Sequence, residues 1–345
     1  MEHSDHDGSG AFRRRLVTSS AALVTVAVVA VVMLGQPRGP SGSGRIDQVQ
    51  PQPVVMPAVP VWYDDDGLHR GTEVYDVPVD PLGGPPRAAH ALALAGNGAL
   101  FVDPAAGDVW FQPWQGVPRV VGHRSRYGPG ADPDGTTAAW FEGDELVVYD
   151  TARGRRIARK AMTEPVTGGS EHLAGNAFRY VDAEEVIWAA DADVVKFDVA
   201  SGEVGMLWSP GDSGTVTQLV RDVHQGWLDW ARVSSDGARV TMLSGEPVAA
   251  FAEPEMFSVF SPDGRYLLAA SRVGGHRAVV GEVPTGDVWF PSADDAYAWL
   301  GWSYGNVAMV LQDPGRGDGT LLGCDVEARE CTPLVHRGPV LLPTS

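Results

Sequence analysis

Lysine is almost absent from this chain. Lys160 and Lys196 are its only lysines, and arginine supplies the other basic side chains. Because 44 Asp and Glu face 26 Lys and Arg, the formal net charge is -18. Proteins bind nucleic acids largely through basic contacts with phosphates, so this composition argues against a nucleic-acid partner. The excess of acidic residues favours cations or basic proteins as partners instead.

Long amphipathic helical stretches are also missing. From Val61 onward, short apolar and aromatic runs alternate with turns, in a chain that contains 42 Gly and 26 Pro. This alternation is typical of short strands joined by tight turns. The sequence therefore predicts an all-β fold for residues 61–345.

Cysteine is equally scarce, since only Cys324 and Cys331 occur. A structural zinc site needs four ligands, and no His or Cys partner lies nearby at zinc spacing. In an oxidising compartment the pair predicts a disulfide that closes a short hairpin, and in a reducing one a dithiol. The compartment therefore decides between the two.

The one long uncharged run lies near the N-terminus, from Leu16 to Leu34. Its length of about 19 residues suffices for a helix to cross a bilayer. Arg13, Arg14 and Arg15 precede it directly, and the positive-inside rule keeps such residues in the cytoplasm. We therefore expect a cytoplasmic tail (1–15), a single-pass signal anchor in the cell membrane (16–34), and an extracytoplasmic remainder.

A cleaved signal peptide is the alternative to this anchor. The residues Met33 to Pro37 offer no small-x-small cleavage site, and no cysteine follows for lipoprotein processing. Residues 35–60 are rich in Pro, Gly, Ser and Gln and are interpreted as a tether. Export would place both cysteines in an oxidising compartment, which favours the disulfide over the dithiol.

A degenerate repeat runs through the rest of the chain. Each unit is an extended run, often ending in an acidic residue, followed by a turn and another strand. The units are spaced roughly 36–48 residues apart, the range of a propeller blade. They can be aligned on Asp76, Gln112, Asp150, Asp198, Leu243, Glu282 and Asp325.

Radial stacking of such units buries both faces of each sheet. Seven units predict a seven-bladed β-propeller. The first unit is short, so six blades with an irregular opening strand remain an alternative, and a β-sandwich is a further one. The segment Pro339–Pro343 is a candidate to complete the first blade.

The block Phe260–Ser271 (FSPDGRYLLAAS) resembles the repeats of WD40-like and TolB-like propellers. The whole layout is similar to that of membrane-anchored WD40-like propeller proteins of high-GC actinobacteria, including VWYDDDGLHRG (61–71) and CDVEAREC (324–331). The resemblance covers roughly Val61 to Val335 and implies the fold. Since these families are largely scaffolds or binding modules, it implies binding rather than a particular activity.

Each motif that could indicate catalysis is explained better by a structural role. Gly211–Gly214 (GDSG) matches the nucleophile loop of trypsin-like proteases, but the other signatures of that family are missing. Asp64–Gly67 and Asp132–Gly135 fit turns, in which Asp caps and Gly takes a positive φ, better than calcium loops. Gly107–Trp110 and Gly286–Trp289 partly match a quinoprotein motif, and packing of Trp on the next blade explains them better.

The histidines are scattered without metal-binding spacing, and no cofactor motif occurs. The sequence predicts no catalytic, cofactor-binding or metal-ligating residue. We expect a non-catalytic module that binds a protein or cell-envelope ligand through loops on one face of the ring. The alternative is an exported hydrolase or quinoprotein-like enzyme. Carboxylates with shifted pKa at the central funnel would favour the enzyme, and a merely acidic rim would favour binding.

Overall fold

The computed structural model describes residues 57–83, 91–125, 127–162, 178–190, 193–208, 218–224, 227–232, 238–242, 247–251, 255–271, 278–283, 285–291, 298–312 and 319–343. The chain divides into two compact units, Met1–Pro51 and Gln52–Ser345, and the described residues belong to the second. The predicted anchor at 16–34 and its three arginines lie outside the described residues. Within the described ranges, no helix is long and apolar enough to span a membrane.

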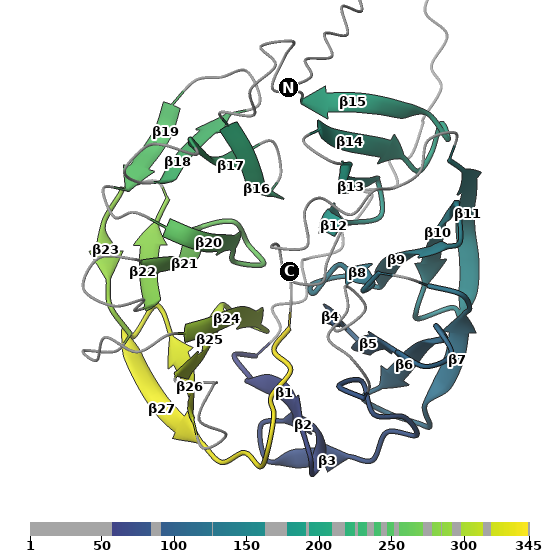
Figure 1. Ribbon diagram of the computed structural model, residues 1–345, viewed down its shortest axis with the longest axis horizontal. Helices are drawn as coiled ribbons and strands as arrows, with labels where there is room; N and C mark the ends of the chain where they lie inside the picture. The colour runs from purple at the N-terminus through teal and green to yellow at the C-terminus, as the bar shows by residue number, and fades with distance from the viewer. Residues whose placement is uncertain are drawn as a thin grey trace, which may run out of the picture. The chain divides into compact units, whose positions relative to one another are not determined.

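Six antiparallel sheets of four strands, the blades, follow one another along the chain and surround a common centre (Figure 1). In chain order they are β4 (Leu92–Ala95), β5 (Gly98–Val102), β6 (Val109–Pro113), β7 (Arg119–Gly122); β8 (Gly130–Ala131), β9 (Thr137–Glu142), β10 (Glu145–Asp150), β11 (Arg155–Ala161); β12 (Phe178–Val181), β13 (Glu185–Ala190), β14 (Asp193–Asp198), β15 (Val204–Trp208); β16 (Gln218–His224), β17 (Trp227–Arg232), β18 (Ala238–Met242), β19 (Pro247–Phe251); β20 (Glu255–Phe260), β21 (Tyr266–Ser271), β22 (Ala278–Glu282), β23 (Val288–Trp289); and β24 (Ala298–Ser303), β25 (Val307–Gln312), β26 (Thr320–Asp325), β27 (Glu330–Leu334).

A smaller sheet lies between the last blade and the first. It consists of β1 (Val61–Asp64), β2 (Gly67–Arg70) and β3 (Glu73–Tyr75). Its Leu68 packs in one apolar cluster with Leu92 of β4, and its Trp62 in another with Met309 of β25. The all-β propeller prediction is therefore confirmed. The predicted seven blades are corrected to six complete blades, the alternative, because the short first unit forms only these three strands.

Burial on both faces explains why the strands are nearly continuous apolar runs. In β10, Leu146 and Val148 pack toward the blade β12–β15, whereas Val147 and Tyr149 pack toward the blade β4–β7. Trp140 of β9 is fully buried in the second of these interfaces. Alternate residues of one strand thus contribute to two different cores, which holds neighbouring blades together.

A recurring turn accounts for the acidic positions of the repeat. The carboxylate of Asp150 accepts the backbone N–H of Arg153 at 2.9 Å, and Gly154 ends the turn at a φ of 65°. Only glycine adopts this left-handed region without steric cost. The same turn between the third and fourth strands begins at Asp198, Glu282 and Asp325.

The turn that begins at Asp325 differs from the other three. Arg329 takes the left-handed position at a φ of 55°, where the others have glycine. Cys324 and Cys331 face each other directly across this turn, on β26 and β27, and form a disulfide. The predicted disulfide is therefore confirmed, and it constrains the turn of this series that lacks glycine.

Reduction of this disulfide is expected to lower the free energy of unfolding by about 2–3 kcal/mol, the chain-entropy contribution of so short a loop. Chemical denaturation of the full-length chain with and without reductant measures the effect. The control is the double variant Cys324→Ala/Cys331→Ala, on which reductant should have no effect. An equal response of this variant would show that the reductant acts elsewhere.

The C-terminal segment Val340–Pro343 closes the ring. The backbone of Leu341 exchanges two hydrogen bonds with Tyr63 of β1, at 3.0 and 2.9 Å, and Pro343 bridges to Leu92 of β4. Figure 1 shows this segment, in yellow, running beside β1 toward the centre. The segment Pro339–Pro343 thus contacts the first sheet, but through isolated bridges and without adding a fourth strand to it.

Candidate binding site on the axial rim

Each innermost strand leads into a turn, and these turns contact one another around the centre. The N–H of Gly96, after β4, donates to Gly135, after β8, at 2.7 Å. The Tyr304 hydroxyl, after β24, donates to the carbonyls of Ala95 and Gly98. We call the turns that follow β4, β8, β12, β20 and β24, together with His224 at the end of β16, the axial rim; it comprises residues 96–97, 132–136, 182–184, 224, 261–265 and 304–306.

Five carboxylates from three blades belong to the axial rim: Asp132, Asp134, Asp182, Glu184 and Asp263. Among the described residues, no Lys or Arg nitrogen lies within 4.0 Å of the first four carboxylates, and Arg265 lies at 4.0 Å from Asp263. The carboxylate of Asp182 is nevertheless satisfied, since it accepts the Tyr180 hydroxyl at 3.0 Å. The rim is therefore acidic and only weakly neutralised by the protein itself.

Asp132 is the most perturbed of these acids. Its carboxylate is partly buried over Gly135 and accepts the N–H of Asp134 at 3.0 Å. Burial, followed by the negative charges of Asp134 and Asp182, raises the pKa of Asp132 to about 6. The fold thus holds a carboxylate where it is costly to ionise.

Asp134 and Asp263 come from blades that are separated by two others around the ring. The Asp134 side chain is exposed, and its carboxylate forms no hydrogen bond or ion pair with the described residues. Its pKa is raised by the surrounding protein and then by the charge of Asp263. The Asp263 carboxylate is held by Asn306, whose amide donates to it at 2.7 Å. Two fixed negative charges therefore oppose each other across the rim.

His224, at the end of β16, is 7% exposed and lies against Gly264 of the neighbouring turn. Its ring stands edge-on to Tyr180, with 5.3 Å between centroids. The Nε2 atom is buried without a hydrogen-bond partner in the described part of the chain. Burial lowers the pKa of His224 to about 4, so the ring is neutral at neutral pH. An orphaned buried nitrogen costs about 1–3 kcal/mol.

The axial rim thus concentrates features that reduce stability: a partly buried carboxylate, opposed charges and an orphaned imidazole nitrogen. Perturbed groups of this kind gather at functional sites more often than elsewhere. Among the described residues, no group of three or more His, Cys, Asp or Glu is arranged to hold a metal ion. The axial rim is suited to recognise positive charge, and Asp132 is suited to transfer a proton.

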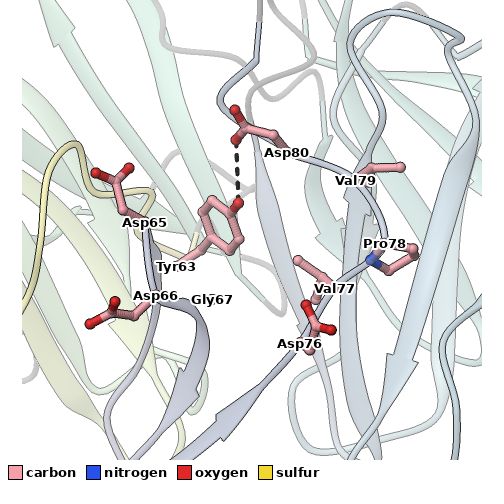
Figure 2. Close-up of a pocket in the computed structure, with 9 residues that line it drawn as sticks. All are labelled: Tyr63, Asp65, Asp66, Gly67, Asp76, Val77, Pro78, Val79 and Asp80. Carbon is pink, nitrogen blue, oxygen red and sulfur yellow. Dashed lines mark hydrogen bonds between the residues drawn. The ribbon is translucent and has the colours of Figure 1, made fainter.

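A second acidic feature lies at the other end of the ring. Leu341 runs antiparallel to β1 but Pro343 runs parallel to β4, so β1 and β4 point in opposite directions. The turn after β1 therefore lies opposite the axial rim. A pocket of about 340 Å³ lies there, between this turn and the segment 76–80. Figure 2 shows the side chains that line it. It is lined by Tyr63, Asp65, Asp66, Gly67, Asp76, Val77, Pro78, Val79 and Asp80.

The residues around the pocket also take part in closing the ring. The Tyr63 hydroxyl donates to Asp80 at 3.3 Å, and Arg337 forms an ion pair with Asp66 at 3.3 Å. Beside it, buried Asp64 accepts the Arg337 N–H at 3.0 Å and contacts His69 Nε2 at 2.8 Å. Burial acts to raise the pKa of Asp64, but these hydrogen bonds outweigh it and lower the pKa. The cluster joins the C-terminal segment to β1 and β2.

The candidate motifs of the sequence that the structure describes form turns and packing contacts. Asp64–Gly67 and Asp132–Gly135 are turns, as predicted, and Gly67 has a φ of 128°. Gly135 is a correction, because its φ is not positive; it is needed because a Cβ there would collide with the Asp132 carboxylate. Trp110 and Trp289 pack against apolar clusters shared with neighbouring sheets, as predicted. The GDSG segment 211–214 lies outside the described residues.

Sequence reasoning missed the axial rim as a site. It treated Asp132 and Asp134 as turn residues and His224 as one scattered histidine. Asp263 follows Pro262 in the FSPDG block, so the repeat itself marked one rim turn. Its proximity to Asp134 depends on the order of blades around the ring, which no local motif encodes.

No model of a known protein family matches the sequence, and no curated protein matches it. Among solved structures, TolB from Acinetobacter baumannii is similar in backbone, with 16% sequence identity, a TM-score of 0.46, and coverage of 70% of this chain and 64% of TolB. A streptogramin B lyase structure gives 10% identity, a TM-score of 0.49, and coverage of 73% and 84%. This chain thus spans less than two thirds of the length of TolB. Identities this low concern the fold alone.

Proposed function

We propose that this chain is a non-catalytic binding module, tethered at the outer face of the cytoplasmic membrane, whose axial rim recognises a cationic segment of an envelope protein. The observation that carries the proposal is the weakly neutralised acidic rim, where Asp132 and Asp134 are held at a cost in stability. The net charge of -18 supports a basic partner, because it steers such partners toward the ring.

The membrane tether rests on the sequence. The uncharged run 16–34 and the preceding Arg13, Arg14 and Arg15 support a single span with the ring outside. The disulfide between Cys324 and Cys331 supports the same placement, since disulfides persist in oxidising compartments.

The test is crosslinking in native membranes with the full-length chain, followed by mass spectrometry of the captured proteins. A partner captured by the wild type is expected to be lost with Asp134→Asn/Asp263→Asn. The matched control, Asp144→Asn/Glu330→Gln, removes the same charge from exposed side chains away from the rim and should keep the partner. Equal loss with both variants would show that overall charge, not the rim, recruits the partner.

A second candidate function, hydrolysis, is favoured by one observation. A carboxyl group with a pKa of about 6, as at Asp132, suits general acid-base catalysis near neutral pH. Carboxylates with shifted pKa values near the centre of the ring favour an enzyme over a binding module. Both shifted carboxylates lie in one turn, however, and Asp132 caps that turn. A hydrolase screen that finds activity abolished by Asp132→Asn would replace the binding proposal with this one.

A further inference from the structure

Basic residues gather in one short stretch of this acidic chain. Five of the eight residues at positions 153–160 are Arg or Lys, and four of these belong to β11, the outermost strand of its blade. Among the outermost strands that the structure describes, no other contains more than one charged residue. Charges on an outer strand commonly prevent pairing with other chains. Since the other outer strands have one charge or none, protection of the edge does not account for four basic residues.

The basic side chains of this stretch remain available to an external anion. Arg153, Arg156 and Arg159 form ion pairs with carboxylates of the same blade, yet their side chains are 71%, 39% and 47% exposed. Exposed pairs of this kind contribute little energy, so another anion can compete for the arginines. Arg155 and Lys160 form no ion pair with any described residue, and the Lys160 ammonium donates to a backbone carbonyl at 2.9 Å.

Arg119 of β7 extends the stretch onto the neighbouring blade. Its guanidinium donates to the Thr151 carbonyl at 3.1 Å, which places it beside the turn that leads into β11. Within β11, Ile157 is 38% exposed among the basic residues. Guanidinium groups bind phosphate in a bidentate manner, and exposed apolar side chains enter the boundary between headgroups and acyl chains. We define the basic stripe as Arg119, Arg153, Arg155, Arg156, Ile157, Arg159 and Lys160.

We propose that the basic stripe is the surface through which the ring docks onto anionic phospholipids of the membrane that tethers it. This inference rests on the membrane tether of the proposed function. Residues 35–56 reach at most about 75 Å when fully extended, so a ring anchored through them stays close to the bilayer. Because tethering raises the local concentration of lipid, a weak contact suffices for docking.

The net charge of -18 favours this lipid surface over a free acidic protein. Overall repulsion opposes the approach of any free anionic partner, which has no tether to offset it. For a tethered ring, charges farther than about 8–10 Å from the contact are screened at physiological salt. Arg119, Arg155 and Lys160, which form no ion pair with the described residues, then dominate the attraction. The ring should therefore approach the lipid with this one edge.

Docking through the basic stripe would orient the ring. β11 lies on its outer wall, whereas the axial rim surrounds its centre (Figure 1). With β11 on the lipid, the axis of the ring runs along the plane of the membrane. The axial rim then faces sideways and stays open to a partner in the envelope.

The test measures how close β11 lies to the lipid headgroups, using a dye on the full-length chain in vesicles. Cys324 and Cys331 are joined, so the dye is attached to one added cysteine. Ile157→Cys on β11 and Val288→Cys on β23 are matched sites, 38% and 42% exposed, on opposite sides of the ring (Figure 1). A nitroxide on the headgroups quenches nearby dyes. With phosphatidylglycerol present, the dye at position 157 should be quenched at least about twofold more than the dye at position 288, and equally in phosphatidylcholine alone.

Arg155→Gln/Lys160→Gln should abolish this difference between the two positions. Raised salt should do the same, because it screens the attraction to the lipid. The matched control, Arg329→Asn/Arg337→Gln, removes the same charge from exposed side chains near the C-terminus and should leave the quenching unchanged. Asparagine suits position 329 because Arg329 has a φ of 55°. Circular dichroism of each variant establishes that the fold is unchanged.

Equal quenching at positions 157 and 288 in anionic vesicles would overturn the proposal, and so would full quenching in Arg155→Gln/Lys160→Gln. If the vesicles gave no quenching but this variant lost a protein captured in native membranes, the basic stripe would bind an acidic protein instead of lipid. Alkaline carbonate extraction tests the tether separately, and the dye is measured in either case. A released chain contradicts the tether of the proposed function, whereas an inserted chain without quenching contradicts only the docking surface.

Discussion

Replacing Leu341 with proline is expected to open the ring. Leu341 is 7% exposed, donates its N–H to Tyr63 at 2.9 Å, and packs with Val61 and Tyr304. Leu341→Ala should cost about 2–4 kcal/mol through the lost apolar contacts. Leu341→Pro should cost about 3 kcal/mol beyond that, because proline also removes the N–H and distorts the pairing. Chemical denaturation of the full-length chain measures both values.

Val335→Ala serves as the control, since Val335 is 84% exposed and close in sequence to Leu341. Its effect should stay within about 0.5 kcal/mol. If Leu341→Pro were as stable as this control, the pairing with Tyr63 would contribute nothing to closure. The β1–β3 sheet would then be held by its packing on Leu92 and Met309 alone.

Asp132→Asn is expected to stabilise the fold above pH 6.5. Burial raises the pKa of Asp132 from 3.8 to about 6, so the folded state binds this proton more tightly than the unfolded state. Stability therefore falls as the pH rises from about 4 to about 6, and the cost stays constant above that range. The shift corresponds to about 3 kcal/mol as an upper limit, and about 1–2 kcal/mol is expected for a partly exposed side chain.

The measurement is the difference in unfolding free energy between variant and wild type from pH 4 to pH 8. The gain should fall to a small remainder by pH 4, where the carboxyl group is protonated in the folded state and nearly half protonated in the unfolded state. His224 acts in the opposite direction: its pKa is lowered to about 4, so the stability it contributes above pH 6.5 is lost as the pH falls to about 4. Both proteins share this term, and it cancels in the difference. A constant gain at every pH would show that the charge of Asp132 is not responsible.

The outcome of this experiment also bears on function. A stabilising Asp132→Asn would mean that the native chain retains a charge against its own stability. Retention of that kind is the usual signature of a residue kept for binding or catalysis. The crosslinking test then distinguishes between these roles.

The fold could be predicted from the sequence because its information is local. Each turn that begins at an acidic residue of the repeat has its hydrogen bonds within four residues, so the repeat could be recognised in the sequence. These residues are Asp150, Asp198, Glu282 and Asp325. The disulfide was predicted for the same reason, since Cys324 and Cys331 flank one such turn. The number of blades was harder to predict from the sequence, because the β1–β3 sheet pairs with a segment from the other end of the chain.

The candidate site could not be predicted, because its properties depend on positions around the ring. The raised pKa of Asp134 depends on burial and then on the charge of Asp263, three blades further on. The orphaned nitrogen of His224 depends on its burial against Gly264. Short motifs describe neither relation. Only the turn itself, Asp132–Gly135, was visible in the sequence.

The pairing of Tyr63 with Leu341 also constrains the order in which the strands of the ring can assemble. Each blade is formed by consecutive strands and can form soon after its residues leave the ribosome or a translocation pore. The β1–β3 sheet is synthesised first, yet its inner edge finds its partner only when residue 341 has emerged. Until then the edge of β1 is open to wrong strands, including those of other nascent chains. Slow or interrupted synthesis should therefore lead to misassembly through the earliest strands rather than through the latest.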